Sequence, residues 1–402
     1  MSHLSAVHPS RRPDFFWGMH AVERGADVSM PHFFPSRRER PQAVAPHPGS
    51  IEGYHALDLS TSAALAYVQD QITHSLPGLR DRPDAETLRR TVVVVDSACD
   101  MPQAWPDYHG IVVVPRAIQT PAGEALETRE PTSLNRFHQQ LAQLLALAPT
   151  TVPTSPIAIR DRIQRHLRRD TTGVVFVTNS ARRSNFYGYA LAAVQSLVLI
   201  HAKVRRAIDP ARPMLRAWIA DSANALTGCG LLLTEAVRMR ETHAPSASIA
   251  QGINEFRSAV HTFAVPGSMG DLARSARAIE MRPIARWKQH LAELLGMLPV
   301  LHMHMDRVRV SERVRGSLRG RVAVLRRALE HVQREAIATP TIVASYAGPL
   351  SDIEELPEFG ELRQQCTRQQ ITLCLSPMSV TGALWLGQGA FSLSLATRRF
   401  VH

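Results

Sequence analysis

The fold is decided by the stretch Thr91-Val-Val-Val-Val-Asp-Ser-Ala-Cys-Asp-Met-Pro102, in which four valines lead into short polar side chains. Such a run is typical of a parallel strand that is buried on both faces. Two later stretches repeat the pattern, Gly173-Val-Val-Phe-Val-Thr-Asn-Ser180 and Arg216-Ala-Trp-Ile-Ala-Asp-Ser222. In an open α/β sheet the ligand binds outside the carboxyl ends of the strands. The three polar ends therefore predict a site for a small polar or anionic group at one edge of a sheet.

From residue 91 onward, apolar strand patterns alternate with helical ones. Strands are predicted at 92–95, 111–114, 174–177 and 215–220, and helices at 134–147, 187–204 and 230–240. This alternation indicates an α/β fold with a mostly parallel sheet and helices on its faces. We expect it to form a first domain over residues 91–248.

The pattern changes after residue 248. Helices are predicted at 249–262, 269–279, 284–295 and 322–336, and strands at 299–305, 308–311, 342–346, 371–375 and 390–395. Helices followed by clustered strands favour an α+β second domain over residues 249–402. Residues 1–90 are predicted to be an N-terminal extension that is partly disordered, because its first part is rich in Pro, His and Arg without a period. One helix is expected there, at 56–75.

Composition narrows the class of protein. The 402 residues carry a net charge of +11, with a sequence pI of about 10.3. Solvated, Arg-rich helices explain this charge better than a nucleic-acid partner, since no basic patch interleaved with aromatic residues is present. No apolar run reaches the roughly 18 residues of a membrane span. The four cysteines match no zinc or CxxC spacing, so we expect reduced cysteines in a cytoplasmic protein.

Other motifs point to no catalytic or metal centre. His302-Met-His304 places two imidazoles on one face of a strand, but no third ligand is near in sequence, so no metal is predicted. A basic run extends from Arg307 to Arg321 and is interpreted as a solvated face, with docking to an acidic partner or to phosphate groups as the alternative. The chain lacks G-x-S-x-G, Walker A, H-E-x-x-H and G-x-G-x-x-G sequences.

The polar strand ends allow two interpretations. A carboxylate that is buried away from water must accept hydrogen bonds from the protein. Hydroxyl groups and the amides of a helix N-terminus can donate them. Ser180 follows a strand and precedes a helix beginning near Asn185, and Thr151 lies in a Pro-flanked loop that could close over it. Both either donate to a ligand head group or cap helices. Asp96, Ser97, Asp221 and Ser222 either bind a polar ligand or fix their loops, and loop fixing is favoured.

Seven segments, taken in order, resemble motifs of the DegV family of fatty-acid-binding proteins. The first, Val94–Pro102, is similar to V-x-D-S-x-x-D-L-P, and Asp221–Gly230 is similar to D-S-x-x-x-S-x-G-x-G. Thr150–Pro156 resembles T-S-Q-P-S-P, with Thr151 on the leading Thr. The other four are Asn179–Phe186 in the place of S-S-x-L-S-G-T-Y, Met269–Arg277 in the place of L-x-x-L-x-K-G-G-R, Leu295–Val300 in the place of L-x-I-K-P-I, and Tyr346–Gly348 in the place of H-A-G. The resemblance runs from about residue 91 to 402, and residues 1–90 lie outside it.

The chain also departs from the family pattern. Where the family has G-P-V-I-G-x-H-T-G-P-G, Ser376–Leu384 is shorter and lacks the His that helps hold the lipid carboxylate. Val152 replaces a Ser, Leu298 replaces a Lys, and Ser275 and Ala276 replace two glycines. Thr151, Ser180 and Arg277 match the family pattern.

The resemblance implies a carrier without catalysis of its own. It would bind a long-chain fatty acid between two domains and present the carboxyl group to a separate ATP-dependent kinase subunit, with no cofactor besides the lipid. Two alternatives stay open: an enzyme for a small anionic substrate at the same hydroxyls, or a non-binding member that interacts through its basic surface. Candidate tunnel-lining residues are Phe186, Leu191 and residues of 284–295, with plain core packing as the default interpretation at each position. The predicted ligand-binding set is Ser180, Thr151, Asn179, Arg277, Asp96, Ser97 and Ser222.

Overall fold

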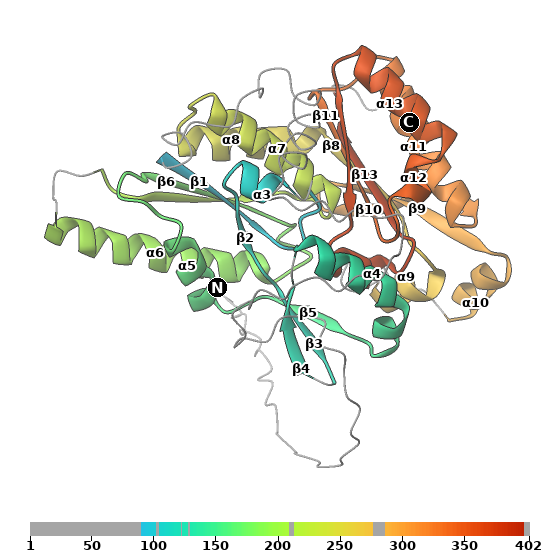
Figure 1. Ribbon diagram of the computed structural model, residues 1–402, viewed down its shortest axis with the longest axis horizontal. Helices are drawn as coiled ribbons and strands as arrows, with labels where there is room; N and C mark the ends of the chain where they lie inside the picture. Colours follow the sequence, from blue (N-terminus) through green and yellow to red (C-terminus); the bar gives the residue numbers. More distant parts are fainter. Residues whose placement is uncertain are drawn as a thin grey trace, which may run out of the picture. The chain divides into compact units, whose positions relative to one another are not determined.

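The structure is a computed structural model that describes residues 90–101, 104–121, 123–127, 129–208, 213–275 and 286–397 (Figure 1). The predictions for residues 1–89, including the helix at 56–75, lie outside the described residues, as does Arg277.

The first sheet is the parallel sheet expected from the sequence. Its strands are β1 (Thr91–Asp96), β2 (Val112–Val114), β6 (Gly173–Thr178) and β7 (Arg216–Asp221), in the order β2-β1-β6-β7. Every neighbouring pair runs parallel. Because parallel strands point the same way, their polar ends meet at one edge.

Helices cover both faces of this sheet, as predicted (Figure 1). Alternate valines of β1 enter two different cores, Val92 and Val94 on one face and Val93 and Val95 on the other. The first core is closed by α5 (Pro156–Gln164) and α6 (Phe186–Ile208), and the second by α7 (Thr227–Glu241) and α8 (Ser246–Phe256). A strand buried on both faces needs this continuous apolar run, which explains the valines. A short helix, α3 (Trp105–Tyr108), joins the second core through Trp105.

The second sheet is mixed and has six strands. They are β8 (Val260–Val265), β9 (Met297–His304), β10 (Arg307–Arg315), β11 (Thr341–Tyr346), β12 (Thr372–Pro377) and β13 (Phe391–Ala396). Their order is β10-β9-β8-β13-β11-β12, and only the β11–β12 pair is parallel. The α/β class with a second, mixed domain is therefore confirmed. The predicted domain boundary after residue 248 falls inside α8, which contacts β7 of the first sheet.

One predicted helix in this region is wrong at its end. The helix expected at 249–262 stops at Phe256, a 3-10 turn covers Arg257–Ala259, and β8 begins at Val260. All six residues of β8 are buried between β9 and β13. A short apolar run cannot be assigned to helix or strand by its period, and here pairing on both edges decides for strand.

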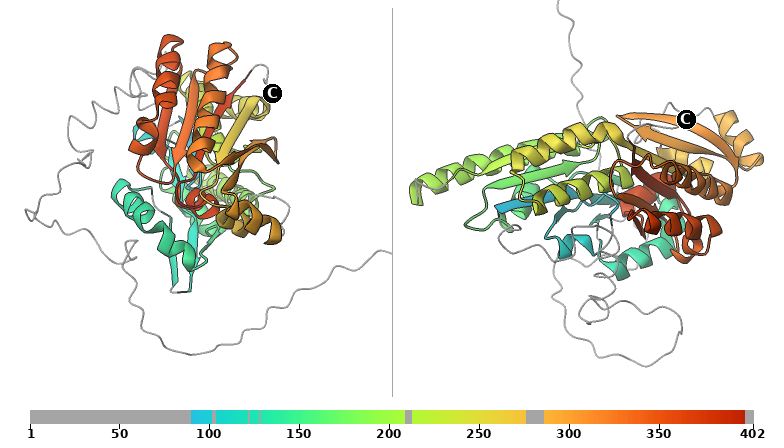
Figure 2. Two further views of the ribbon diagram at one scale, coloured as in Figure 1. Left: turned by 90° about the vertical axis from the view of Figure 1, so that its right-hand side faces the viewer. Right: turned by 90° about the horizontal axis from the view of Figure 1, so that it is seen from above.

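Helices of the second domain are α9 (Met269–Ser275), α10 (Arg286–Leu294), α11 (Ser317–Gln333), α12 (Ser351–Glu354), α13 (Pro357–Arg368) and α14 (Val380–Leu386). Figure 2 shows α11 and α13 side by side over the second sheet. Between the two sheets lies α7, which contacts β1 and β6 on one side and β8, β11 and β13 on the other. Its Thr227 hydroxyl is 2.7 Å from the hydroxyls of both Ser392 and Ser394. The helix therefore couples the two sheets.

A small third sheet was not expected from the sequence. It consists of β3 (Ala117–Thr120), β4 (Gly123–Leu126) and β5 (Thr150–Val152), and α4 (Pro131–Ala146) connects the last two. Thr151 pairs with Ile118 in this sheet. The interpretation of Thr151 as part of a loop is therefore wrong, because antiparallel pairing with β3 draws the segment into a strand.

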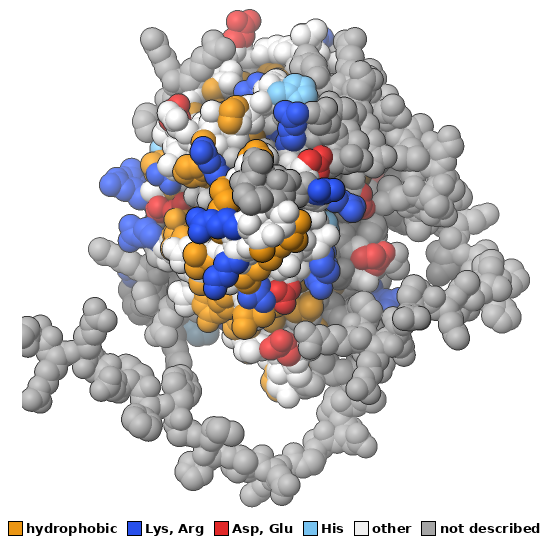
Figure 3. Space-filling view, turned by 90° about the vertical axis from the view of Figure 1, so that its left-hand side faces the viewer, with side chains coloured by type: hydrophobic (Ala, Val, Ile, Leu, Met, Phe, Trp, Pro, Cys, Tyr) orange, Lys and Arg blue, Asp and Glu red, His pale blue; other side chains and the backbone are white. Residues whose placement is uncertain are grey.

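The exposed side chains at the end of α6 and the burial of the cysteines are typical of a globular protein. Leu199, Val204 and Ile208 expose about half or more of their side chains along the end of α6, and Figure 3 shows basic and apolar side chains mixed on this face. All four cysteines are free and buried. Among the described helices, none combines the length and apolar character that crossing a membrane requires.

Candidate functional site at the strand ends

The carboxyl ends of β1, β6 and β7 gather the polar side chains that the sequence predicted there. Asp96 Oδ1 accepts a hydrogen bond from Asn179 Nδ2 at 2.9 Å, which joins the ends of β1 and β6. The Ala181 amide donates to Asp221 Oδ1 at 3.1 Å, which joins the ends of β6 and β7. The expected gathering at one sheet edge is therefore present.

Asp96 is fixed by a buried ion pair that the sequence did not reveal. Arg116 Nη2 donates to Asp96 Oδ2 at 3.2 Å, and both side chains are almost fully buried. Arg116 Nη1 also donates to Ser184 Oγ at 3.1 Å, and its guanidinium lies 4.9 Å from the ring centre of Phe186. Asp96 Oδ1 further accepts the Ala98 amide at 2.9 Å. These contacts match the loop-fixing interpretation of Asp96, and no local pattern marks Arg116 as its partner.

Ser97 takes part in a second buried cluster, together with Glu127 and Thr381. Ser97 Oγ donates to Glu127 Oε2 at 2.6 Å and accepts the Arg116 amide at 2.9 Å. Thr381 donates to the same carboxylate from its amide, at 2.9 Å, and from its hydroxyl, at 2.8 Å. Burial raises the pKa of Glu127, and the three donors oppose that rise. The carboxylate thus fills the N-terminus of α14, where amide groups favour an anion.

Asp100 makes a similar link to the second domain. Its Oδ2 accepts the Ser345 hydroxyl at 2.6 Å, and its Oδ1 accepts the Ser379 amide at 2.8 Å. Burial raises the pKa of Asp100 as well. Asp100 and Glu127 both come from the first half of the chain, so two buried carboxylates hold the start of α14 against the end of β1.

Ser180 and Ser222 lie in adjacent turns. The Ser180 amide donates to the Asn224 carbonyl at 2.8 Å, and the Ser222 hydroxyl donates to the same carbonyl at 2.9 Å. Ser222 Oγ also accepts the Asn224 amide at 3.1 Å, so its hydroxyl fixes its own turn. Asp221 accepts the Ala223 amide at 2.9 Å in the same turn. Burial is the main cause that raises the pKa of Asp221, and the charge of Asp306 adds to it.

The Ser180 hydroxyl donates to the carboxylate of Asp306. Ser180 is fully buried, whereas Asp306 is half-buried at the tip of the hairpin that joins β9 to β10. The Asp306 amide donates to the Ala223 carbonyl at 2.8 Å, which ties the hairpin tip to the turn after β7. We call Ser180, the turn 221–224 and Asp306 the turn cluster. Sequence reasoning missed Asp306, which follows Ser180 by 126 positions.

Thr151 stands apart from this cluster. Thr151 is half-buried on β5, and within the described part of the chain no hydrogen bond joins it to Ser180, Asn179 or Asp96. Arg277 belongs to a segment outside the described residues. The structure therefore brings together Asp96, Ser97 and Asn179 on one side and Ser180 with Ser222 on the other.

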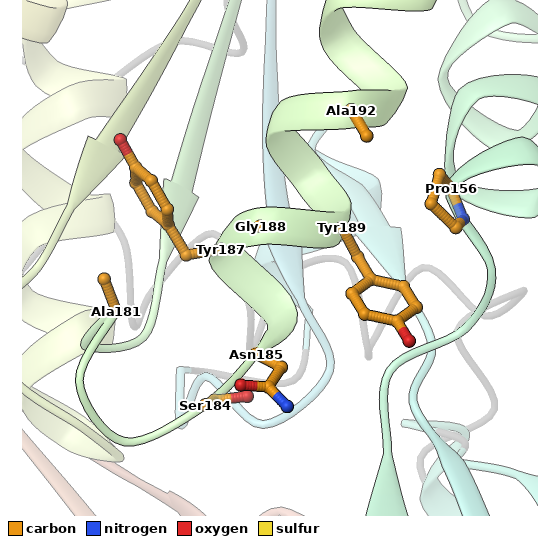
Figure 4. Close-up of a pocket in the computed structure, with 8 residues that line it drawn as sticks. All are labelled: Pro156, Ala181, Ser184, Asn185, Tyr187, Gly188, Tyr189 and Ala192. Atoms are coloured by element: carbon orange, nitrogen blue, oxygen red, sulfur yellow. The ribbon is translucent and has the colours of Figure 1, made fainter. Parts of the chain in front are cut away.

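A pocket of about 480 Å³ lies beside the start of α6 (Figure 4). Tyr189 lies on the Pro156 side of the helix start, and Tyr187 lies on the Ala181 side. Ser184, the hydrogen-bond partner of Arg116, lines it too. Two candidate tunnel residues lie in different environments. Phe186 packs in the core, with its ring centre 5.8 Å from that of Phe176, and Leu191 is 38% exposed.

The two histidines of β9 meet a third from β8. His261 Nδ1 is 2.9 Å from His302 Nε2, and the rings of His261 and His304 stack with centroids 4.2 Å apart. Over the described ranges, no group of three His, Cys, Asp or Glu side chains is arranged to hold a metal ion. His261 was missed because it is brought to His302 by strand pairing rather than by spacing.

Comparison with known proteins agrees with the architecture. A family model described as the uncharacterised DegV family matches residues 90–398. A DegV domain-containing protein of Xanthomonas campestris pv. campestris is 29% identical over 313 residues, which cover 76% of this chain and 97% of that protein.

Two solved structures share the fold at low sequence identity. One is described as DegV, a fatty acid binding protein from Bacillus subtilis, with a TM-score of 0.59, 15% identity, and coverage of 77% of this chain and 100% of that one. The other is the Streptococcus pneumoniae fatty acid kinase B3 protein loaded with linoleic acid, with a TM-score of 0.57, 13% identity, and coverage of 77% and 99%. The two sheets, the motifs at the strand ends and the family match over most of the length agree, and the chain belongs to the DegV family.

Proposed function

We propose that this protein binds a long-chain fatty acid, or a similar apolar carboxylate, as a carrier without catalysis of its own. One observation carries the proposal. The described residues match solved family members over 99–100% of those chains, and these members are a fatty acid binding protein and a protein loaded with linoleic acid. Each buried methylene of an acyl chain contributes about 0.8 kcal/mol, so a long chain supplies ample driving force.

The head group is proposed to bind near Ser180. This hydroxyl lies two residues after the end of β6 and six residues before Phe186, the first residue of the long helix α6. A carboxylate there would accept hydrogen bonds from the hydroxyl and gain from the positive end of the helix. Thr151 and Arg277 are proposed as further contacts, on the strength of the family resemblance.

We further propose that the bound carboxyl group is presented to a separate kinase subunit. The kinase B3 protein of Streptococcus pneumoniae, which shares the fold, supports this step. In the reaction a carboxylate oxygen attacks the γ-phosphorus of ATP, the bond to the β-phosphate oxygen breaks, and ADP leaves an acyl phosphate behind.

Lipid binding is tested on the purified full chain. Organic extraction followed by mass spectrometry is expected to recover a fatty acid, and adding fatty acids to the delipidated protein is expected to raise its melting temperature. A lipid-free extract together with no thermal shift for any chain length would contradict the proposal.

The kinase step needs a separate assay. The loaded protein is mixed with Mg-ATP and a fatty acid kinase subunit from the same organism, and hydroxylamine is added to trap acyl phosphate as the hydroxamate. Hydroxamate formation that requires both proteins supports presentation. Hydroxamate from the kinase and free fatty acid alone, at an equal rate, counts against it.

A further inference from the structure

The Ser180 hydroxyl, which is proposed to bind the ligand, already donates a hydrogen bond to a carboxylate of the protein itself. Ser180 Oγ donates to Asp306, and no other side chain among the described residues takes that proton. A serine hydroxyl has one hydrogen and so donates to one acceptor at a time. A ligand carboxylate and the Asp306 carboxylate therefore compete for the same donor.

The hairpin between β9 and β10 is shaped to deliver Asp306 to this place. His304 pairs with Arg307, which leaves Met305 and Asp306 as a two-residue turn. Both residues have positive φ, 46° and 63°, as the tight turns of β-hairpins require. The turn points Asp306 at the ends of β6 and β7, where its amide binds the Ala223 carbonyl.

Two carboxylates of the turn cluster, Asp306 and Asp221, lie around Ser180, and the charge of Arg257 partly offsets that of Asp221. Asp221, in the same turn cluster, accepts the Ala181 and Ala223 amides through one oxygen. Its pKa is raised chiefly by burial and additionally by the charge of Asp306. A third carboxylate placed against Ser180 would meet two like charges, which disfavours its ionised form.

We propose that Asp306 is an internal cap on the head-group site, and that an anionic head group reaches Ser180 only when the hairpin tip withdraws. The inference rests on the proposed function, because it concerns the same hydroxyl. Asp306 stands in for the ligand carboxylate when no ligand is bound. The cap makes binding sensitive to the charge of the head group, since an uncharged head group does not face the same repulsion.

The test compares an anionic and an uncharged lipid of equal chain length. Oleate and oleyl alcohol are titrated into the delipidated full chain, as wild type and as the Asp306→Asn and Asp306→Gly variants. Asn and Gly both tolerate the positive φ at this position, so the turn is retained. Releasing a charged hydrogen bond is expected to tighten oleate binding by about tenfold to a hundredfold, with a much smaller change for oleyl alcohol.

Two further variants test whether the gain in affinity comes from the hydrogen bond between Asp306 and Ser180 rather than from a change in overall charge. Glu312→Gln removes one negative charge from an exposed position of β10 in the same hairpin, and it is expected to leave both affinities unchanged. Ser180→Ala in the Asp306→Asn background is expected to abolish the gain in oleate affinity, as a double-mutant cycle requires when the two residues compete through one bond. Melting temperatures and circular dichroism check that each variant is folded.

The outcomes distinguish this inference from the proposed function. If the wild type binds oleate and Asp306→Asn and Asp306→Gly bind it no more tightly, the cap is overturned and the carrier function stands. An equal gain in Glu312→Gln also overturns the cap, because the effect would then be long-range charge alone. If neither lipid binds to any variant, the proposed function fails and the cap fails with it.

Discussion

Thr381 and Glu127 lie 254 positions apart, and the Thr381 amide donates to Glu127 Oε1 at 2.9 Å while its hydroxyl donates to Oε2 at 2.8 Å. Ser97 supplies a third donor to the same carboxylate. The contact joins the small third sheet to the helix α14 of the second domain. The free energy of unfolding of the protein is therefore expected to depend on this one buried carboxylate.

Glu127→Ala is expected to lower the free energy of unfolding by about 2–5 kcal/mol, because it leaves three buried donors without an acceptor. Urea denaturation followed by circular dichroism measures the change. Glu124→Ala is the matched control, since Glu124 is exposed on the neighbouring strand β4 and should change stability by less than about 0.5 kcal/mol. Equal losses in the two variants would contradict the assignment.

The raised pKa of Glu127 predicts a pH dependence. A carboxyl group whose pKa is higher in the folded state binds its proton more tightly there. Its ionisation therefore leaves the free energy of unfolding unchanged below the ordinary pKa of 4.5 and lowers that free energy as the pH rises through the raised pKa. Glu127→Gln removes this titration. Unfolding free energies measured from below pH 4.5 to neutral should therefore give a difference, variant minus wild type, that grows with pH. A flat difference would mean that the pKa is not raised.

Thr151→Val tests the proposed ligand contact of β5. Valine has nearly the same shape as threonine but lacks the hydroxyl, and Thr151 is half-buried, so stability should change by less than about 1 kcal/mol. Loss of one hydrogen bond to a carboxylate should weaken oleate binding by about tenfold. Thr150→Val, on the exposed neighbour, is the control and should bind oleate like the wild type. Unchanged affinity in Thr151→Val would remove this residue from the site.

Gly230 is predicted to be irreplaceable in α7. A Cβ at this position would overlap the Asp100 carbonyl oxygen, and this backbone atom cannot swing aside as a flexible side chain could. Gly230→Ala is expected to destabilise the fold by more than about 2 kcal/mol, in the range of overpacked cores. Gly188→Ala in α6 meets nothing within 4 Å and should stabilise its helix by about 0.5–1 kcal/mol. Thermal melting of the two variants should move in opposite directions.

Local patterns determined the strands of the first sheet and the polar residues at their ends. The valines of β1 and the Asp-Ser and Asn-Ser ends could be recognised because buried parallel strands and their turns leave a signal within a few residues. Asp96, Asn179 and Ser222 could thus be placed at one edge of a sheet from the sequence alone. The same kind of signal failed at β8, where six apolar and polar residues were consistent with helix or strand until pairing with β9 and β13 chose between them.

Only the tertiary structure decided which charges meet these polar ends. Arg116 pairs with Asp96, Glu127 with Ser97 and Thr381, and Asp306 with Ser180. None of these partners is marked by spacing or period, because each lies in a different connection of the chain. Arg116 lies between β2 and β3, Glu127 follows β4, and Asp306 lies in the turn between β9 and β10. A periodic pattern reports which side of an element is buried, whereas a hydrogen bond between distant residues depends on how the elements dock. The sequence alone therefore determined which polar residues lie at the carboxyl ends of the strands, and docking of the β9–β10 hairpin decided that the Asp306 carboxylate accepts the Ser180 hydroxyl.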